Sequence, residues 1–92
     1  MRKVAREIVV AILTGTTKKV SNTTFDAKTG EVFLHGNRIL TFLGGQALID
    51  STTVERWDTV TTRSRVNEIL GGLGILGGLS RKAGKTTITQ PV

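Results

Sequence analysis

The sequence has no cysteine and no tyrosine, and it contains one histidine, one tryptophan and one proline. Without cysteine, the chain cannot form disulfide bonds, thiolate nucleophiles or thiolate metal ligands. Acidic residues are also scarce, with 7 Asp and Glu against 13 Lys and Arg, and they are scattered singly. The sequence therefore indicates no pair of carboxylates for hydrolysis and no group of carboxylates for binding a metal ion. We expect neither an enzyme nor a metal or cofactor site.

A long apolar segment is missing as well. The N-terminal stretch MRKVAREIVVAILTG begins like a secretion signal, but Glu7 interrupts it and the apolar run Ile8–Leu13 is short. No small-residue cleavage site follows, and no segment approaches the length of a membrane span. We expect a single small domain over residues 1–92, located in the cytoplasm and without a membrane partner.

Basic residues are plentiful, and they give the chain a formal net charge of +6. Such a balance favours polyanions as partners, through a long-range attraction that salt weakens. Most of the candidate residues for binding nucleic acid or another partner fall in expected loops or at helix ends: Lys18, Lys19, Arg38, Arg56, Arg63, Arg65, Arg81, Lys82 and Lys85.

The N-terminal segment predicts a helix that ends at Gly15. Its apolar residues share one helical side, at Val4, Ile8, Ala11 and Ile12. Val9, Val10 and Leu13 make the last turns apolar nearly all round, so the helix is either covered on two sides or forms a self-association surface. A homo-oligomer through this helix is therefore open. A strand is the alternative to a helix, because the run contains β-branched residues.

Residues 16–23 are polar and are expected to form a loop, whereas residues 25–50 have the pattern of strands joined by tight turns. Gly36-Asn37 is placed as a two-residue hairpin turn, and Gly44-Gly45 as a second one. The cross-strand pairs that follow are Phe33 with Leu40, Leu40 with Ile49, and Phe42 with Ala47. Both faces of this meander are partly apolar, so we expect a helix on one face and further cover on the other.

The segment after Trp57 predicts a second, short helix. Its apolar residues recur at helical spacing, at Val66, Ile69, Leu70 and Leu73. Thr61 or Thr62 can cap its first turn, and Gly71-Gly72 can end it. A Gly-rich, basic connection over residues 71–85, a final strand and a flexible tail over residues 90–92 follow. The predicted fold class is α+β: an N-terminal helix, an antiparallel meander of three or four strands, the second helix and a C-terminal strand.

Helix formation does not explain Arg63 and Arg65. On a helical wheel they flank the apolar stripe from opposite sides, so both are expected to reach solvent. A positive charge in the first turn is mildly unfavourable with the helix dipole. The two arginines are either solvated charges, with Arg65 pairing with Glu68, or phosphate contacts beside a helix N-terminus that already favours anions.

Three further features have competing interpretations. Gly78–Thr87 has the composition of a phosphate loop, but Gly78 and Gly84 lie one residue too far apart and no helix can follow, so a basic hairpin turn is predicted. His35 has no second ligand or nucleophile in view and is expected to hydrogen-bond the backbone or cap the hairpin. Trp57 is expected in the core, with stacking on a nucleobase as the alternative.

The stretches LHGNRI (Leu34–Ile39) and WDTVTTRSRVNEIL (Trp57–Leu70) together resemble a pattern found in short tailed-phage proteins that form a domain-of-unknown-function family. The matching positions are Gly15, Asn22, Thr23, Leu34, His35, Gly36, Asn37, Ile39, Trp57, Thr59, Thr61, Thr62, Arg63, Arg65, Val66 and Asn67. Arg56 stands where the family often has glycine, and the segment before Trp57 is longer than in the pattern. The resemblance implies a fold and a phage origin, in an infected bacterial host, but no activity.

Two functions stay open for such a chain, with an enzyme a distant third. The first is association with nucleic acid through backbone phosphates, without sequence specificity. The second is inhibition of a host protein by binding. Basic residues gathered on one face would favour nucleic acid, whereas dispersed basic residues beside an apolar patch would favour a host protein.

Overall fold

The structure, a computed structural model, describes residues 2–91 of the chain. The elements are α1 (Lys3–Thr14), β1 (Lys18–Val20), β2 (Thr23–Asp26), β3 (Glu31–Leu34), β4 (Asn37–Leu43), β5 (Gln46–Ile49), α2 (Ser51–Arg56), α3 (Val60–Gly72), β6 (Gly78–Lys82) and β7 (Lys85–Thr89). Strands β1 to β5 form an antiparallel meander, and β6 pairs with β7 in a separate ribbon. The predicted α+β class is confirmed. The meander has five strands, more than expected, and a hairpin replaces the single C-terminal strand.

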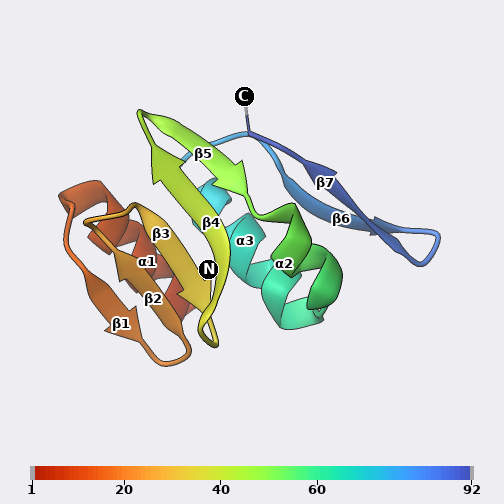
Figure 1. Ribbon diagram of the computed structural model, residues 1–92, viewed down its shortest axis with the longest axis horizontal. Helices are drawn as coiled ribbons and strands as arrows, with labels where there is room; N and C mark the ends of the chain where they lie inside the picture. Colours follow the sequence, from red (N-terminus) through yellow and green to blue (C-terminus); the bar gives the residue numbers. More distant parts are fainter. Residues whose placement is uncertain (1, 92) are drawn as a thin grey trace.

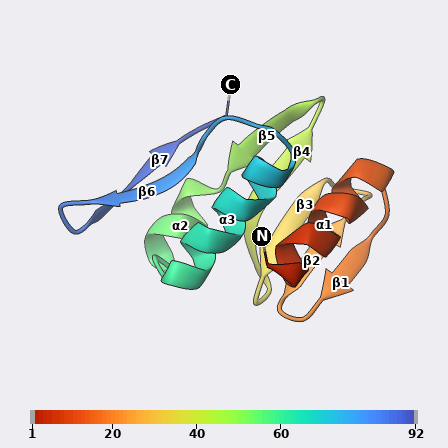
Figure 2. The ribbon, with the colours of Figure 1, turned by 180° about the vertical axis from the view of Figure 1, so that it is seen from behind.

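Two helices cover one face of the meander. Figure 1 shows the sheet in front of α1 and α3, and Figure 2 shows the same two helices in front of the sheet. The core between these layers includes Ala5, Ile8, Phe25, Val32, Leu40, Ile49, Val66, Ile69 and Leu70. Further cover on the other face is not found among residues 2–91, where Leu43 and Leu48 on the meander are 74% and 58% exposed. None of the described helices is long and apolar enough to span a membrane.

Helix α1 ends at Gly15 as predicted, and the strand alternative for this segment is wrong. The buried side of α1 is wider than the predicted stripe, because both the sheet and α3 pack against it. Val9 is therefore buried within the chain and cannot form part of a self-association surface. Val10 and Leu13 are the residues of the expected surface that stay exposed.

The turn between β3 and β4 lies one residue earlier than predicted. Its central residues are His35 and Gly36, with φ of +51° and +79°, and Leu34 pairs with Asn37 across it. Positive φ at both positions is what a two-residue turn matching the twist of a hairpin requires. The second turn, at Gly44-Gly45, is confirmed.

A bulge then shifts the register of β3 against β4. Leu40 faces Val32 and not Phe33, whereas the predicted pairs of Leu40 with Ile49 and of Phe42 with Ala47 are confirmed. Ile39 is the extra residue of the bulge, and both Ile39 and Leu40 are buried. A strictly alternating strand would place one of these two side chains on the open face.

Two elements were missed by the sequence analysis. Residues 16–23, expected to form a loop, contain β1 and the start of β2. Lys18 and Lys19 belong to β1, an edge strand, where lysine discourages pairing with a strand of another chain. Helix α2 begins after Asp50, whose carboxylate accepts a hydrogen bond from the Thr53 N–H at 2.9 Å. This cap offsets the low helix propensity of the threonines that follow.

Two side-chain amides hold the β6–β7 ribbon on the body of the protein. Asn67 of α3 donates to the Leu79 carbonyl and accepts from the Leu79 N–H, both at 2.7 Å. Gln90 makes the same pair of bonds to the backbone of Ile49, both at 2.8 Å. Each side-chain carboxamide thus pairs with both the N–H and the C=O of one backbone residue, as a residue of a neighbouring strand would.

These contacts change two expectations for the C-terminal part. The expected connection over residues 71–85 contains the end of α3 and all of β6. The expected flexible tail over residues 90–92 is wrong at Gln90, which is bonded to β5, and Val92 lies outside the described residues. Gly78 is also needed here, because a Cβ at this position would lie 2.4 Å from the Asn67 Oδ1.

Replacing Asn67 with Ala should destabilise the protein by about 1–3 kcal/mol, because two hydrogen bonds of about 0.5–1.5 kcal/mol each are lost. Urea unfolding followed by circular dichroism measures the change. Ser80→Ala, at an exposed position of the same ribbon, is the control and should stay within about 0.5 kcal/mol of wild type. Equal stability of Asn67→Ala and wild type would show that the amide does not hold the ribbon.

Candidate functional site

Arg65 of α3 is buried, with 5% of its surface exposed. Its guanidinium donates to the side-chain oxygens of Asn22 and Thr23 at the start of β2. Burial lowers the pKa of Arg65, and the nearby negative charge of Glu68 partly opposes this shift. The expectation that Arg65 reaches solvent is wrong, and its buried guanidinium is not presented to a phosphate. The helical wheel failed because α3 is covered by α1 as well as by the sheet, so its buried arc is wider than its apolar stripe.

Asp58, in the link between α2 and α3, gathers several hydrogen-bond donors. Its carboxylate accepts from the Thr86 hydroxyl at 2.5 Å, from Arg63 at 2.6 Å and from Arg81 at 3.4 Å. The Thr86 hydroxyl, followed by the two arginines, holds the pKa of Asp58 below its ordinary value, although partial burial opposes the shift. Asp58 therefore ties the ribbon to the body, and the Arg63 side chain, only 17% exposed, is neutralised and not free to bind phosphate.

The remaining nominated cations do not share one face. Arg38 is bonded at 2.9 Å to both Glu31 and Asp50. Lys18 and Lys19 on β1 and the tip of the ribbon lie at opposite ends of the molecule (Figure 1). The exposed apolar side chains are dispersed as well, since Val10 and Leu13 are on α1 and others are on β4, β5 and α3. The nominated basic residues are thus not gathered on one face, as expected for nucleic-acid binding, and the exposed apolar residues do not form one patch, as expected for binding a host protein.

Three of the nominated basic residues lie on the β6–β7 ribbon. Arg81 and Lys82 end β6, Lys85 begins β7, and all three are exposed. The hairpin prediction for Gly78–Thr87 is confirmed, and the ribbon extends away from the sheet (Figures 1 and 2). No Asp or Glu follows Glu68 in the sequence. The ribbon is therefore a projecting element that carries positive charge alone.

The cap of α3 is formed by Thr59 and not by Thr61 or Thr62. The Thr59 hydroxyl accepts from the Thr62 N–H at 3.1 Å and lies 3.0 Å from the Thr62 hydroxyl. Thr62 is buried beneath this cap, and the side chain of Thr61 is only partly covered. The threonines do initiate a helix, as predicted, but the helix starts earlier in the run.

Trp57 is not a core residue, because 46% of its surface is exposed. Its backbone N–H closes the last turn of α2 by bonding to the Thr53 carbonyl at 2.8 Å. The guanidinium of Arg56 lies 5.7 Å from the centroid of the indole ring, within the range of a cation–π interaction. Capping uses the backbone of Trp57 alone, so it does not explain why the chain exposes its single indole ring.

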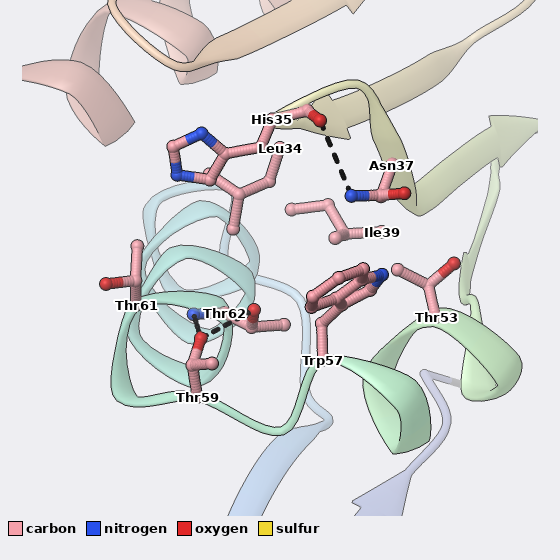
Figure 3. A pocket seen from close by; sticks show the side chains of 9 residues that line it. All are labelled: Leu34, His35, Asn37, Ile39, Thr53, Trp57, Thr59, Thr61 and Thr62. Atoms are coloured by element: carbon pink, nitrogen blue, oxygen red, sulfur yellow. Dashed lines mark hydrogen bonds between the residues drawn. The ribbon is translucent and has the colours of Figure 1, made fainter.

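A cavity of about 530 Å³ opens beside this ring (Figure 3). It is lined by Leu34, His35, Asn37, Ile39, Thr53, Trp57, Thr59, Thr61 and Thr62. The β3–β4 hairpin forms one wall, and the α2–α3 segment forms the other. Leu34 and Ile39 are buried and apolar, whereas His35 and Trp57 are exposed at the opening. Apart from His35, the lining consists of residues without an ionisable side chain.

His35 lies in the turn and not beside it. Its backbone N–H donates to the Asn22 carbonyl at 2.8 Å, which fixes the turn, and its ring lies 3.4 Å from the Asn22 amide nitrogen. Among residues 2–91, no group of three or more His, Cys, Asp or Glu side chains is arranged to hold a metal ion.

The cavity brings together the two stretches that carry the phage-protein resemblance. Sequence reasoning nominated basic residues and missed the uncharged lining, above all Asn37, Thr53 and Thr61. The signal that pointed to most of this lining was the joint occurrence of LHGNRI and WDTVTT in one pattern. Of the residues in that pattern, Asn22, Arg65 and Asn67 make bonds that hold the fold together.

Comparison with known proteins assigns the chain to a family. The sequence model of the family described as Kyanoviridae Gp96 protein matches residues 1–91. The chain belongs to this family, a phage protein family of unknown function, as the resemblance implied. No curated protein and no solved structure matches the chain.

The position of the α3 cap can be tested with two matched substitutions. Thr59→Ala should destabilise the protein by about 1 kcal/mol, because it leaves a first-turn N–H without its acceptor. Thr61→Ala should change stability by less than about 0.5 kcal/mol. Urea unfolding of both variants measures the difference, and a larger effect at Thr61 would place the cap there.

Acid should weaken the link between the ribbon and the body. The folded-state pKa of Asp58 lies below its ordinary value of 3.8, so its ionised form contributes stability above that pH. This contribution is lost as the pH falls through the lower, folded-state pKa. Thermal melts from pH 7 to pH 2 should show a flatter acid limb for Asp58→Asn than for wild type. Glu55→Gln, at an exposed position of α2, is the control, and identical acid limbs for Asp58→Asn and wild type would contradict the assignment.

Proposed function

We propose that this member of the Kyanoviridae Gp96 family is a non-catalytic phage accessory protein that binds nucleic acid, through contacts of the β6–β7 ribbon with backbone phosphates. The observation that carries the proposal is the projecting, purely basic ribbon. Its tip holds Arg81, Lys82 and Lys85, and no acidic residue lies between Glu68 and the last residue of the sequence. Arg56 at the end of α2 is also exposed, two residues before Asp58, which bonds to the ribbon, and we include it as a fourth candidate cation.

The shape of the ribbon supports this function. A two-stranded β-ribbon is narrow enough to enter the major groove of a duplex, and lysine and arginine along it displace counterions from the phosphates. The ribbon is bonded to α3 through Asn67 and to the α2–α3 link through Asp58. These bonds fix its direction before binding, which reduces the ordering cost of association.

The structure narrows the set of binding residues. Arg38 and Arg63 are paired with carboxylates at 2.6–2.9 Å, and Arg65 is buried, so these three are removed from the proposed binding set. Arg81 is kept because its distance to Asp58 is longer, at 3.4 Å. Lys18 and Lys19 are exposed but lie at the far end of the molecule (Figure 1). The proposed phosphate contacts are therefore Arg56, Arg81, Lys82 and Lys85.

Binding of a host protein is the second candidate, and the exposed Val10 and Leu13 on α1 are the observation that favours it. The same two side chains are those through which a homo-oligomer would form. Sedimentation of the purified protein distinguishes these possibilities, because a monomer at high concentration leaves the α1 surface free for another partner.

The ribbon proposal is tested by titrating a short labelled duplex, and a labelled single strand, over a salt series. Wild type should bind with a Kd of about 10⁻⁴–10⁻⁶ M near physiological salt, the range of non-specific binding. The double variant Lys82→Gln/Lys85→Gln should bind more weakly, and its log–log salt slope should be smaller by about one to two units. The matched control, Lys18→Gln/Lys19→Gln, removes the same charge from β1 and should keep the slope of wild type.

Two results would count against the proposal. Equal losses in the two double variants would mean that net charge, and not the ribbon, governs binding. No binding by wild type at low salt would rule out a nucleic-acid partner and favour the host-protein alternative.

A further inference from the structure

We propose that the cavity beside Trp57 binds one unstacked nucleobase, so that the protein prefers a single strand to a duplex. This inference rests on the proposed function and names the form of nucleic acid that the site takes. It assigns a role to the uncharged cavity, whereas the function proposed above concerns only the charged ribbon.

The indole ring of Trp57 provides the stacking surface. Nearly half of this residue is exposed, although burial of a tryptophan is strongly favourable. The ring borders the cavity, and the guanidinium of Arg56 lies 5.7 Å from its centroid. An aromatic side chain next to an arginine is the combination with which proteins hold single strands, because the ring stacks on a base and the cation attracts the neighbouring phosphate.

The size and lining of the cavity fit a base better than a phosphate. About 530 Å³ lies within the range of sites for small organic groups, and no lining side chain provides a fixed positive charge. Leu34 and Ile39 supply apolar surface. Figure 3 shows no hydrogen bond from the Thr61 hydroxyl to another lining residue, whereas the Thr53 oxygen lies on the side of that residue away from Trp57. The Thr61 hydroxyl and the oxygen of the Asn37 amide, whose nitrogen donates to the His35 carbonyl at 3.4 Å, offer polar groups to the edge of a base.

The cavity and the ribbon are joined through one residue. Asp58 directly follows Trp57 and bonds to Arg81 of β6 and Thr86 of β7. The basic ribbon is therefore held at a fixed distance from the stacking surface. A strand whose phosphates contact the ribbon can place a base in the cavity, whereas a duplex must first unpair and unstack that base, which costs free energy.

The test compares two labelled single strands that have the same number of phosphates, one of deoxyadenosine residues and one fully abasic. Stacking of one base should make wild type bind the base-containing strand about 5- to 150-fold more tightly than the abasic strand. Trp57→Leu should remove this preference. Lys82→Gln/Lys85→Gln should weaken binding to both strands by the same factor and keep the preference.

Two further variants serve as controls. Val60→Ala changes an exposed apolar residue of the same segment outside the cavity lining, and it should bind both strands as wild type does. Trp57→Phe keeps a smaller aromatic ring and should retain part of the preference, which separates stacking from a loss of structure. Circular dichroism melts establish that each variant is folded.

The outcomes separate this inference from the proposed function. Salt-sensitive binding of both strands with equal affinity by wild type would overturn the nucleobase site and leave the ribbon proposal standing. A preference that persists in Trp57→Leu would also overturn it, because the base would then bind elsewhere. A base preference without salt dependence would overturn the ribbon proposal and keep the cavity. Binding of neither strand would overturn both proposals.

Discussion

The contacts of Asn22 set the distance between the two walls of the cavity. Its side-chain oxygen accepts from the buried guanidinium of Arg65 on α3, and its backbone carbonyl accepts from the His35 N–H in the β3–β4 turn. Asn22, the residue directly before β2, therefore connects the helix of one wall with the turn of the other. The Nε of Arg65 is buried without a hydrogen-bond partner among the described residues, so loss of the bonds to Asn22 and Thr23 would leave the buried guanidinium without acceptors, which is costly. This arrangement therefore tolerates little displacement of α3. The cavity beside Trp57 depends on that constraint.

Side-chain hydrogen bonds between elements far apart in the sequence occur elsewhere in the fold. A chain of 92 residues buries a limited apolar core, and the β6–β7 ribbon adds little to it, with Leu79 as its buried apolar side chain. Asn67, Gln90 and Asp58 supply directional bonds where apolar packing is thin. Many polar residues of the phage-protein pattern are thus explained by folding. Trp57 and Thr61 are not, and they line the cavity.

Local patterns predicted the local features of the structure. The stripe of Val66, Ile69 and Leu70, the end of α1 at Gly15 and the Gly44-Gly45 turn each depend on a few neighbouring residues, and all were predicted correctly. The bulge at Ile39 and the burial of Arg65 depend on partners far along the chain. A helical wheel describes one helix, so it cannot show that a second helix will cover its polar side.

The candidate site was predictable only in its charged part. Basic residues of the ribbon were nominated from composition, but the cavity joins Leu34–Ile39 to Thr53–Thr62, and no periodicity within either segment shows that they meet. Asp50 was placed at the end of the strand region over residues 25–50, so its role as the cap of α2 was missed. Without α2, nothing in the sequence indicated that Trp57 would lie at a helix end and not in the core.

The placement of the acidic residues, more than the net charge, decides which cations can act on a partner. Glu31, Asp50 and Asp58 engage Arg38, Arg63 and, at longer range, Arg81, so much of the positive charge near the meander is compensated. The chain beyond Glu68 has no carboxylate of its own, and Lys82 and Lys85 make no ion pair within the described part of the molecule. The net positive charge of +6 is therefore distributed unevenly over the molecule, and among the described residues the basic side chains without a close carboxylate partner include those of the ribbon. Asp58 has two effects on the proposed site. It partly neutralises Arg81, and through its bonds to Arg81 and Thr86 it also fixes the position of the ribbon relative to Trp57.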